Sequence, residues 1–132
     1  MTDENPDLPG DVELKLPASA AFVAILRSVT AGLAARCDLT LDEIEDLRLA
    51  VDEACALLLP HALPGGALTA RFALRPGKLD VTAGVPALAE AEPDREGFAW
   101  TVLCALAENV RVSARDDELV IALTKRRAAL AQ

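Results

Sequence analysis

The sequence has few of the residues that build metal centres and disulfide frameworks. It contains three cysteines and one histidine, and no two cysteines form a Cys-x-x-Cys pair. A structural zinc site needs about four such ligands at short spacing, and a disulfide framework needs paired cysteines, so neither is expected. Cys55 and Cys104 stand between apolar neighbours, and Cys37 has Ala34, Ala35 and Leu39 nearby in the chain. We therefore expect all three to be reduced, buried packing residues.

Basic side chains are fewer than acidic ones. The chain has 13 basic and 21 acidic residues, which gives a net charge of −8. Such a chain repels phosphate backbones, so direct DNA or RNA binding is not expected. No apolar run approaches the ~20 residues that a membrane span needs. Residues 1–7 are acidic and lack the basic start and apolar stretch of a secretory signal. We expect a cytoplasmic protein.

The length of 132 residues suits one domain, since a second core would leave each part too small to be stable. We expect a flexible acidic leader over residues 1–10, a single domain over residues 11–127 and a short tail over residues 128–132.

The first half of the domain contains a strand and two helices. In residues 11–16 charged and apolar side chains alternate, which predicts a strand with one solvent-exposed face. In residues 18–36 apolar side chains recur every three or four residues, which predicts an amphipathic helix, and Ser19 is its candidate N-cap. The order Thr40-Leu41-Asp42-Glu43 predicts a capping box and a second helix that runs to about Leu59, before Pro60.

The second half contains two hairpins and a third helix. Residues 68–74 and 78–83 flank a Pro-Gly turn, and residues 110–114 and 119–123 flank an Asp-Asp turn. Residues 85–95 show no clear period and predict a loop, and a helix should begin after Gly97. The predicted fold is α+β, a two-layer sandwich of a mainly antiparallel sheet with three helices on one face.

The second predicted helix has an unusual outward face. Its core side is apolar, with Ile44, Leu47, Val51, Ala54, Cys55 and Leu58. Glu53 points away from that side, and Leu57 lies only about 40° from Glu53, with Ala50 and His61 nearby. A carboxylate next to a large apolar side chain predicts that something packs on the outward face.

Residues 46–55, with the sequence Asp-Leu-Arg-Leu-Ala-Val-Asp-Glu-Ala-Cys, resemble the N-box helix of the anti-sigma regulatory kinases of the RsbW and SpoIIAB type. These belong to the Bergerat-fold (GHKL) superfamily of ATPases and kinases. Residues 97–107 resemble that family's next helix, and the likeness extends over most of residues 12–126. It implies a cytoplasmic anti-sigma factor that binds a sigma factor, is released by an anti-anti-sigma (STAS) protein and forms a homodimer. The partner-binding candidates near the first helix and the loop after it are Arg27, Arg36, Asp38, Asp42 and Glu45.

The resemblance also implies where the catalytic residues of active members would fall. An N-box glutamate orients or activates the attacking group, and an asparagine four residues later binds magnesium. Here these positions hold Glu53 and Leu57. Magnesium needs oxygen ligands, and leucine supplies none. We therefore expect no metal ligand, no bound cofactor and a vestigial Glu53.

Two other family motifs are reduced. The turn after the third strand, which holds an adenine-binding aspartate in active members, reads Val81-Thr82-Ala83-Gly84-Val85-Pro86, and the phosphate lid retains only Gly97. Gly84 and Gly97 remain the candidate cofactor-binding residues. One alternative stays open, an ATP-magnesium-dependent serine kinase that phosphorylates its antagonist; another is an unrelated two-layer binding domain. Trp100 is either a core residue or a partner-binding anchor, and His61 either ends the helix or belongs to the site.

Overall fold

The computed structural model describes residues 10–129, so the predicted leader, apart from Gly10, and residues 130–132 of the tail lie outside the described residues. The chain forms five strands and three α-helices, with two short 3-10 helices. In chain order these are β1 Asp11–Pro17, η1 Ala20–Phe22, α1 Val23–Arg36, α2 Leu41–Leu58, η2 Leu59–His61, β2 Ala67–Arg75, β3 Lys78–Pro86, α3 Phe98–Leu106, β4 Glu108–Arg115 and β5 Glu118–Arg126.

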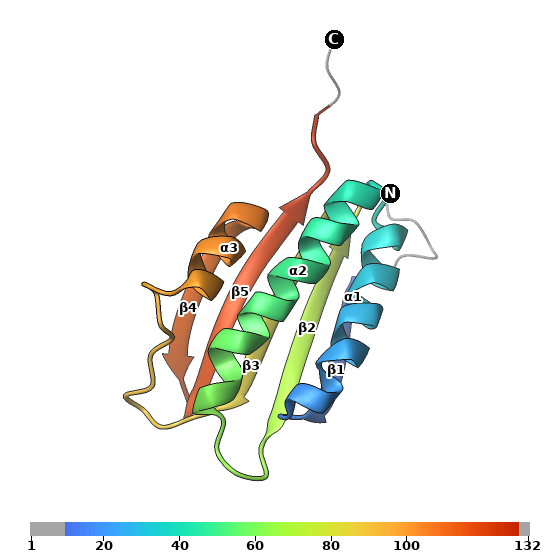
Figure 1. Cartoon of the computed structure of the whole chain (residues 1–132). Coiled ribbons are helices and arrows are strands. Elements are labelled where there is room, and N and C mark those ends of the chain that lie inside the picture. Colours follow the sequence, from blue (N-terminus) through green and yellow to red (C-terminus); the bar gives the residue numbers. More distant parts are fainter. Residues whose placement is uncertain (1–9, 130–132) are drawn as a thin grey trace.

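The strands form one antiparallel sheet in the order β1-β2-β3-β5-β4, so β1 and β4 are its edges. All three α-helices cover the same face of the sheet, with α2 between α1 and α3 (Figure 1). This arrangement confirms the predicted α+β two-layer fold. The described part of the chain holds no helix that is long and apolar enough to cross a membrane.

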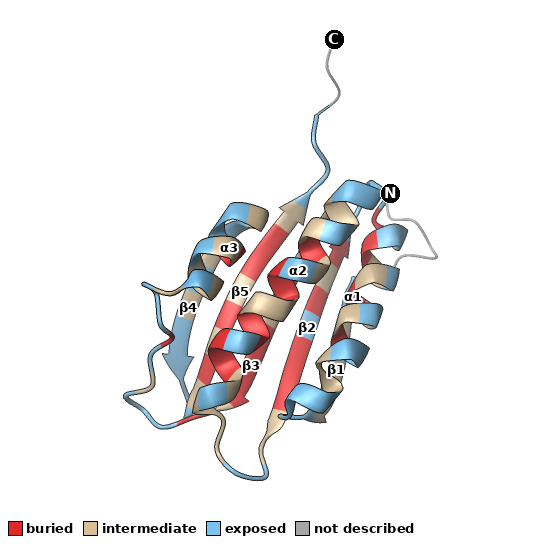
Figure 2. Cartoon of the chain, viewed as in Figure 1, coloured by how far each residue is buried: buried red, intermediate tan, exposed pale blue. Residues whose placement is uncertain are grey.

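Alternate residues of the central strands build the core. The buried side chains that face the helices come from β2, β3 and β5 and are Leu68, Ala70, Phe72, Leu74, Leu79, Val81, Ala83, Val85, Leu119, Ile121 and Leu123. Figure 2 shows these central strands largely in red behind the helices. The other face of the sheet carries charged side chains, including the ion pair Arg71 Nε–Glu13 Oε2 at 3.0 Å. The period-two pattern of the strands therefore sets which face the helices cover.

The start of α2 has the predicted capping box. Thr40 Oγ1 accepts from the Glu43 backbone N–H at 3.2 Å, and Glu43 Oε1 accepts from the Thr40 N–H at 2.8 Å. The second Glu43 oxygen accepts from the Ala128 N–H at 2.8 Å. These backbone hydrogen bonds lower the pKa of Glu43 below its ordinary value of 4.5. The chain end beyond β5 is thus bonded to the first turn of α2.

Two local predictions need correction. The predicted loop over residues 85–95 begins later, because β3 continues through Val85 and Pro86 and pairs with β5 up to Glu118. Cys104 is exposed, whereas Cys37 and Cys55 are buried as expected. In α3 it is Leu103 that faces the core, and the next residue is turned away by about 100°. Burial raises the pKa of the Cys37 thiol and raises that of Cys55 to about 12.

Candidate functional site

The face of α2 that was predicted to point outward is covered by the rest of the fold. Ala50 is fully buried, and Leu57 is only 5% exposed. Asp46 lies on the same stripe of the helix, and its carboxylate binds Lys125 Nζ of β5 at 3.2 Å. The Lys125 ammonium also donates to the carbonyl of Leu106, at the end of α3, at 2.8 Å. The stripe therefore faces β5 and α3, so the predicted packing on this face comes from other elements of the same chain.

Glu53 lies on this stripe between Ala50 and Leu57, and it is half-buried. Within residues 10–129 its carboxylate makes no hydrogen bond or ion pair. One turn further on, Leu57 belongs to the hydrophobic core and carries no oxygen donor. In the described part of the chain no three His, Cys, Asp or Glu side chains lie close enough to hold a metal ion. The other carboxylate of the stripe, Asp46, is paired with Lys125, so among the described residues Glu53 has no second oxygen ligand beside it.

A hollow of about 580 Å³ lies between the end of α2 and the loop after β3. It is lined by residues 60–63 on one side and by residues 88 and 90–92 on the other. The Leu63 N–H donates to the Pro86 carbonyl at 2.9 Å, which holds the two walls together. The volume suits a small-molecule site, but the polar side chains of the loop wall are the carboxylates of Glu90 and Glu92. The hollow therefore disfavours a phosphate and favours a neutral or cationic group.

The N-terminus of α3 already lies against a carboxylate of this chain. Gly97 is the N-cap residue, and a side chain added to it would meet Asp94 Oδ2 at 2.8 Å. Asp94 Oδ1 accepts from the Glu96 backbone N–H at 3.0 Å. The missing side chain of Gly97 thus makes room for Asp94, whose charge complements the positive end of the helix.

Gly84 lies inside β3 on the sheet face away from the helices, because its neighbours Ala83 and Val85 face the core. A Cβ added to Gly84 would meet Val120 Cγ2 at 3.0 Å and the Glu118 carboxyl at 3.1 Å. The absence of a side chain therefore lets β5 side chains pack closely over this strand. The structure gives Gly84 a packing role and places it on the opposite side of the sheet from Glu53.

The five partner-binding candidates do not form one cluster. Arg27 Nε binds Asp52 Oδ1 at 2.9 Å, which joins α1 to α2. Glu45 pairs with Arg48 at 2.8 Å on α2. The remaining candidates, Arg36, Asp38 and Asp42, are exposed around the turn between α1 and α2.

Several features of the site were not predicted from the sequence. Lys125 continues the helix-facing alternation of Leu119, Ile121 and Leu123, so the period of β5 could have identified it as a residue that faces α2. Trp100 is half-buried against the core, and the Arg95 guanidinium lies 5.2 Å from its ring centroid. Trp100 thus has features of both predicted roles, because it contacts the core and remains partly accessible.

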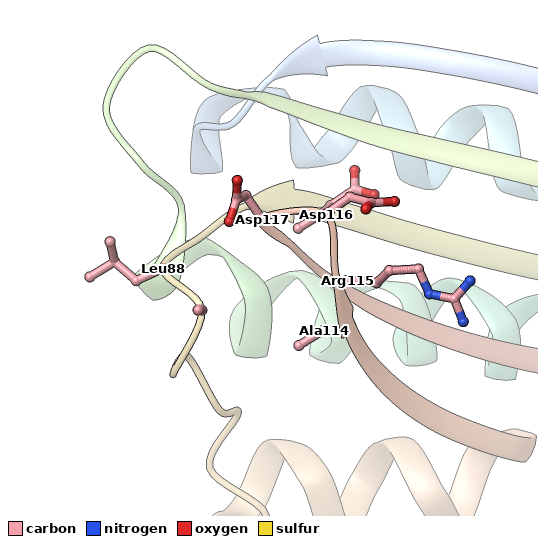
Figure 3. A pocket seen from close by; sticks show the side chains of 7 residues that line it. Leu88, Ala114, Arg115, Asp116 and Asp117 are labelled. Carbon is pink, nitrogen blue, oxygen red and sulfur yellow. The ribbon is translucent and has the colours of Figure 1, made fainter.

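A second hollow of about 150 Å³ lies where the loop after β3 meets the β4–β5 turn. Figure 3 shows Leu88 on the loop and the carboxylates of Asp116 and Asp117 on the turn, with the Arg115 side chain directed away from Leu88. The Ala87 N–H donates to the Asp117 carbonyl at 3.0 Å, which connects loop and turn. Leu88 lines both hollows and is 63% exposed.

Comparison with known proteins identifies the family to which this fold belongs. Residues 16–125 match the histidine kinase-like ATPase domain. The chain is 35% identical over 127 residues to the anti-sigma-F factor RsbW of Mycobacterium tuberculosis (strain ATCC 25618 / H37Rv), which covers 89% of this chain and 74% of that relative. It is 40% identical over 73 residues to the serine-protein kinase RsbW of Bacillus subtilis (strain 168), which covers 53% of this chain and 46% of that relative.

The curated Bacillus relatives are therefore matched over less than half of their own length. Among solved structures, the RsbU and RsbW domains of Rv1364c from Mycobacterium tuberculosis superpose with a TM-score of 0.72 at 16% identity, over 94% of this chain and 34% of that chain. That likeness shows the fold. The family match over residues 16–125 excludes an unrelated domain. The chain belongs to the histidine kinase-like ATPase domain family, as a member of the RsbW type.

Proposed function

We propose that the protein is an anti-sigma factor that binds a stress- or sporulation-type RNA polymerase sigma factor and is released by an anti-anti-sigma protein of the STAS type. The observation that carries this proposal is the 35% identity to an anti-sigma-F factor over 89% of the chain. The net charge of −8 supports it, because an acidic protein complements the basic, DNA-facing surfaces of a sigma factor. The chain acts in the cytoplasm, where its partners are.

The proposed function makes no efficient use of ATP. At the position that the family uses for a magnesium ligand, Leu57 is buried in the core and has no oxygen to offer. Phosphoryl transfer relies on such a metal to neutralise developing charge, so the residues present do not fit magnesium-bound ATP. Release of the sigma factor then rests on competition between partners for overlapping surfaces.

The surroundings of α3 support the same proposal. The Asp94 carboxylate lies at the helix N-terminus, where a phosphate would need the backbone amides, and Glu90 and Glu92 line the neighbouring hollow. A triphosphate would meet like charge on both sides.

The second candidate function is an ATP-dependent serine kinase that phosphorylates the antagonist. It is favoured by Glu53, which is half-buried on the helix stripe, and by the 40% identity to a serine-protein kinase over 73 residues. This function needs another oxygen ligand, or water, in place of the missing asparagine.

Isothermal titration separates these two candidates. We expect heat of binding with a stress- or sporulation-type sigma factor of the same organism, and no heat with ATP and magnesium up to millimolar concentration. The Bacillus subtilis serine-protein kinase RsbW is the positive control. Micromolar, magnesium-dependent ATP binding contradicts the nucleotide-free mechanism. Failure to retain any sigma factor or STAS protein in a pull-down contradicts the anti-sigma function itself.

The proposal includes a homodimer, for which β1 is the candidate edge. Every residue of β1 pairs with β2 on one side, which leaves the backbone groups on its other edge unpaired within residues 10–129. Sedimentation equilibrium measures this, and a mass of one chain at micromolar concentration contradicts the dimer.

A further inference from the structure

The helix α3 has an outer face that carries no charge. None of its nine residues is acidic or basic. Its inner side packs against the core through Leu103, with Ala99, Trp100 and Leu106 partly buried. The outer side consists of exposed residues, which are Phe98, Thr101, Cys104 and Ala105. Figure 2 shows this side of α3 in pale blue and tan at the margin of the helical layer.

Such an outer face is unusual for a surface helix, whose exposed side normally carries charged residues. Phe98 is 79% exposed, although aromatic side chains favour burial more strongly than most. The helix α2 also exposes large apolar side chains, Leu41 and Leu49, but there the charged Asp42 and Glu45 are exposed beside them. The outer face of α3 has the character of a surface that another molecule covers.

An acidic segment leads directly into this face. Residues 90–96 carry four exposed carboxylates, of Glu90, Glu92, Asp94 and Glu96, against one basic side chain, Arg95. That arginine lies over the Trp100 ring and 3.8 Å from Glu92. Asp94 and Glu96 complement the positive end of α3, but Glu90 and Glu92 lie too far ahead of the helix for this role. Leu88, two residues before the segment, is a second exposed apolar side chain.

Charge identifies the kind of molecule that fits. A second copy of the chain on a two-fold axis would bring two such acidic segments together, which is unfavourable. Residues 1–9 add three acidic side chains and no basic one, so they do not complement the segment either. A helix with one apolar face and flanking lysine or arginine matches both the uncharged face and the carboxylates.

We propose that the outer face of α3 and residues 88–96, together termed the α3 surface, bind a basic amphipathic helical segment of a protein partner. The apolar side chains of that segment cover Phe98 and Ala105, and its basic side chains pair with Glu90 and Glu92. The proposal rests on the proposed function only for the identity of the partner, which is then the sigma factor. The surface itself is tested without that identity.

Cys104 makes the surface measurable, because it is the one exposed cysteine and lies within the α3 surface. The probe is a synthetic Leu/Lys amphipathic helix of about 14 residues, some 21 Å long, which exceeds the ~13.5 Å of α3. A Leu/Glu peptide of the same pattern and a Leu/Lys peptide of scrambled order are the controls. The readouts are the binding isotherm and the rate at which iodoacetamide alkylates Cys104 in the full chain.

We expect the Leu/Lys helix to bind with micromolar affinity and to slow alkylation about tenfold, and both control peptides to have no effect. Phe98→Ser should weaken binding at least about tenfold, whereas the matched Ile25→Ser on the exposed face of α1 should not. The double variant Glu90→Gln/Glu92→Gln should weaken both the binding and its dependence on salt. The control Asp11→Asn/Glu13→Gln removes two exposed carboxylates from β1, at the far edge of the sheet, and should change neither. Because all these side chains are exposed, the variants should have the same melting temperature as the unmodified protein, which shows that each variant is folded.

Several results overturn the proposal. Unchanged alkylation of Cys104 at saturating peptide, or equal effects of the Phe98 and Ile25 variants, places the peptide elsewhere. Alkylation that slows with protein concentration alone, with a dimer in sedimentation, assigns the α3 surface to a second copy. If the sigma factor binds without protecting Cys104, the surface does not serve that partner; if the peptide protects Cys104 but no sigma factor binds, the proposed function fails and the surface stands.

Discussion

The ammonium of Lys125 lies 3.2 Å from the carboxylate of Asp46, and the same ammonium donates to the Leu106 carbonyl at 2.8 Å. This one side chain connects the last strand, the second helix and the end of the third. The Lys125 side chain is only 14% exposed, so the bonds form where water competes weakly. It fixes α3 beside the stripe of α2 that carries Glu53 and Leu57.

Replacement of Lys125 by methionine should therefore lower the free energy of unfolding by about 1–3 kcal/mol, because Asp46 and a helix-end carbonyl lose their partner. Urea denaturation measures the loss. The matched control is Lys78→Met, which removes a more exposed ion pair with Asp80 at 3.8 Å and should cost less than about 1 kcal/mol. Equal costs for the two variants contradict a structural role for Lys125.

Leu57→Asn should destabilise the protein by about 3 kcal/mol, since it places an amide in a site built for an apolar side chain. Leu49→Asn, on the same helix but 48% exposed, should cost less than about 1 kcal/mol. Chemical denaturation gives both values. Because Asp94 and the loop carboxylates remain, titration of the Leu57 variant with ATP and magnesium should still show no heat; restored binding identifies Leu57 as the sole obstacle.

The capping box predicts a specific dependence on pH. The pKa of Glu43 is lowered in the folded protein, so its stabilising effect is fully present above the ordinary value of 4.5 and disappears as the pH falls through the lowered pKa. Glu43→Gln should melt below the unmodified protein at pH 7, and the difference should shrink as the pH falls from 4.5 through the lowered pKa of Glu43. Thermal melts across this range test the sign, with Glu90→Gln as an exposed control; a difference independent of pH rules out the ionised cap.

Thiol chemistry should distinguish the three cysteines. Ellman's reagent should modify one thiol per native chain and three in denaturant, because Cys37 and Cys55 are buried. Burial raises the pKa of Cys55 to about 12 and also raises that of Cys37, so both should stay unreactive at pH 9. Cys104→Ser should abolish the native reaction, and any remaining fast thiol contradicts the burial of the other two.

The turn between β4 and β5 stores backbone strain. Asp116 and Asp117 have φ of 55° and 61°, the left-handed conformation that glycine adopts most easily. Asp117→Gly should therefore raise stability by about 1 kcal/mol, measured as the unfolding midpoint. The reciprocal control is Gly77→Ala in the β2–β3 turn, where φ is 72° and the substitution should be destabilising by a similar amount. If Asp117→Gly lowers the unfolding midpoint, the backbone of this turn is not strained.

The sequence predicts elements that depend on neighbours in the chain. The capping box at Thr40, the Pro-Gly hairpin and the alternating strands all follow from interactions a few residues apart, and the structure confirms them. The three helices on one face follow from the apolar periods, which leave no other way to bury both layers.

The site was harder to predict, because it depends on which elements meet in space. A helical projection identifies Ala50 and Leu57 as opposite the core, but it does not include α3, which covers them. The same omission leads to the wrong expectation for Cys104, because a single sequence does not show which side of a short apolar helix faces inward. The roles of Glu53, Gly84 and Gly97 toward a nucleotide stay predictions.

The hydrogen bond from Ala128 to Glu43 closes the domain on itself, since it joins the segment after the final strand to the start of the second helix, 85 residues earlier. The strand β5 is an inner strand of the sheet, and the segment after it donates a hydrogen bond to Glu43, whose carboxylate also accepts from the Thr40 N–H at the start of α2. Detachment of the segment that contains Ala128 therefore destabilises the first turn of α2, the helix that carries Glu53. A ligand that binds one of these two places will change the stability of the other.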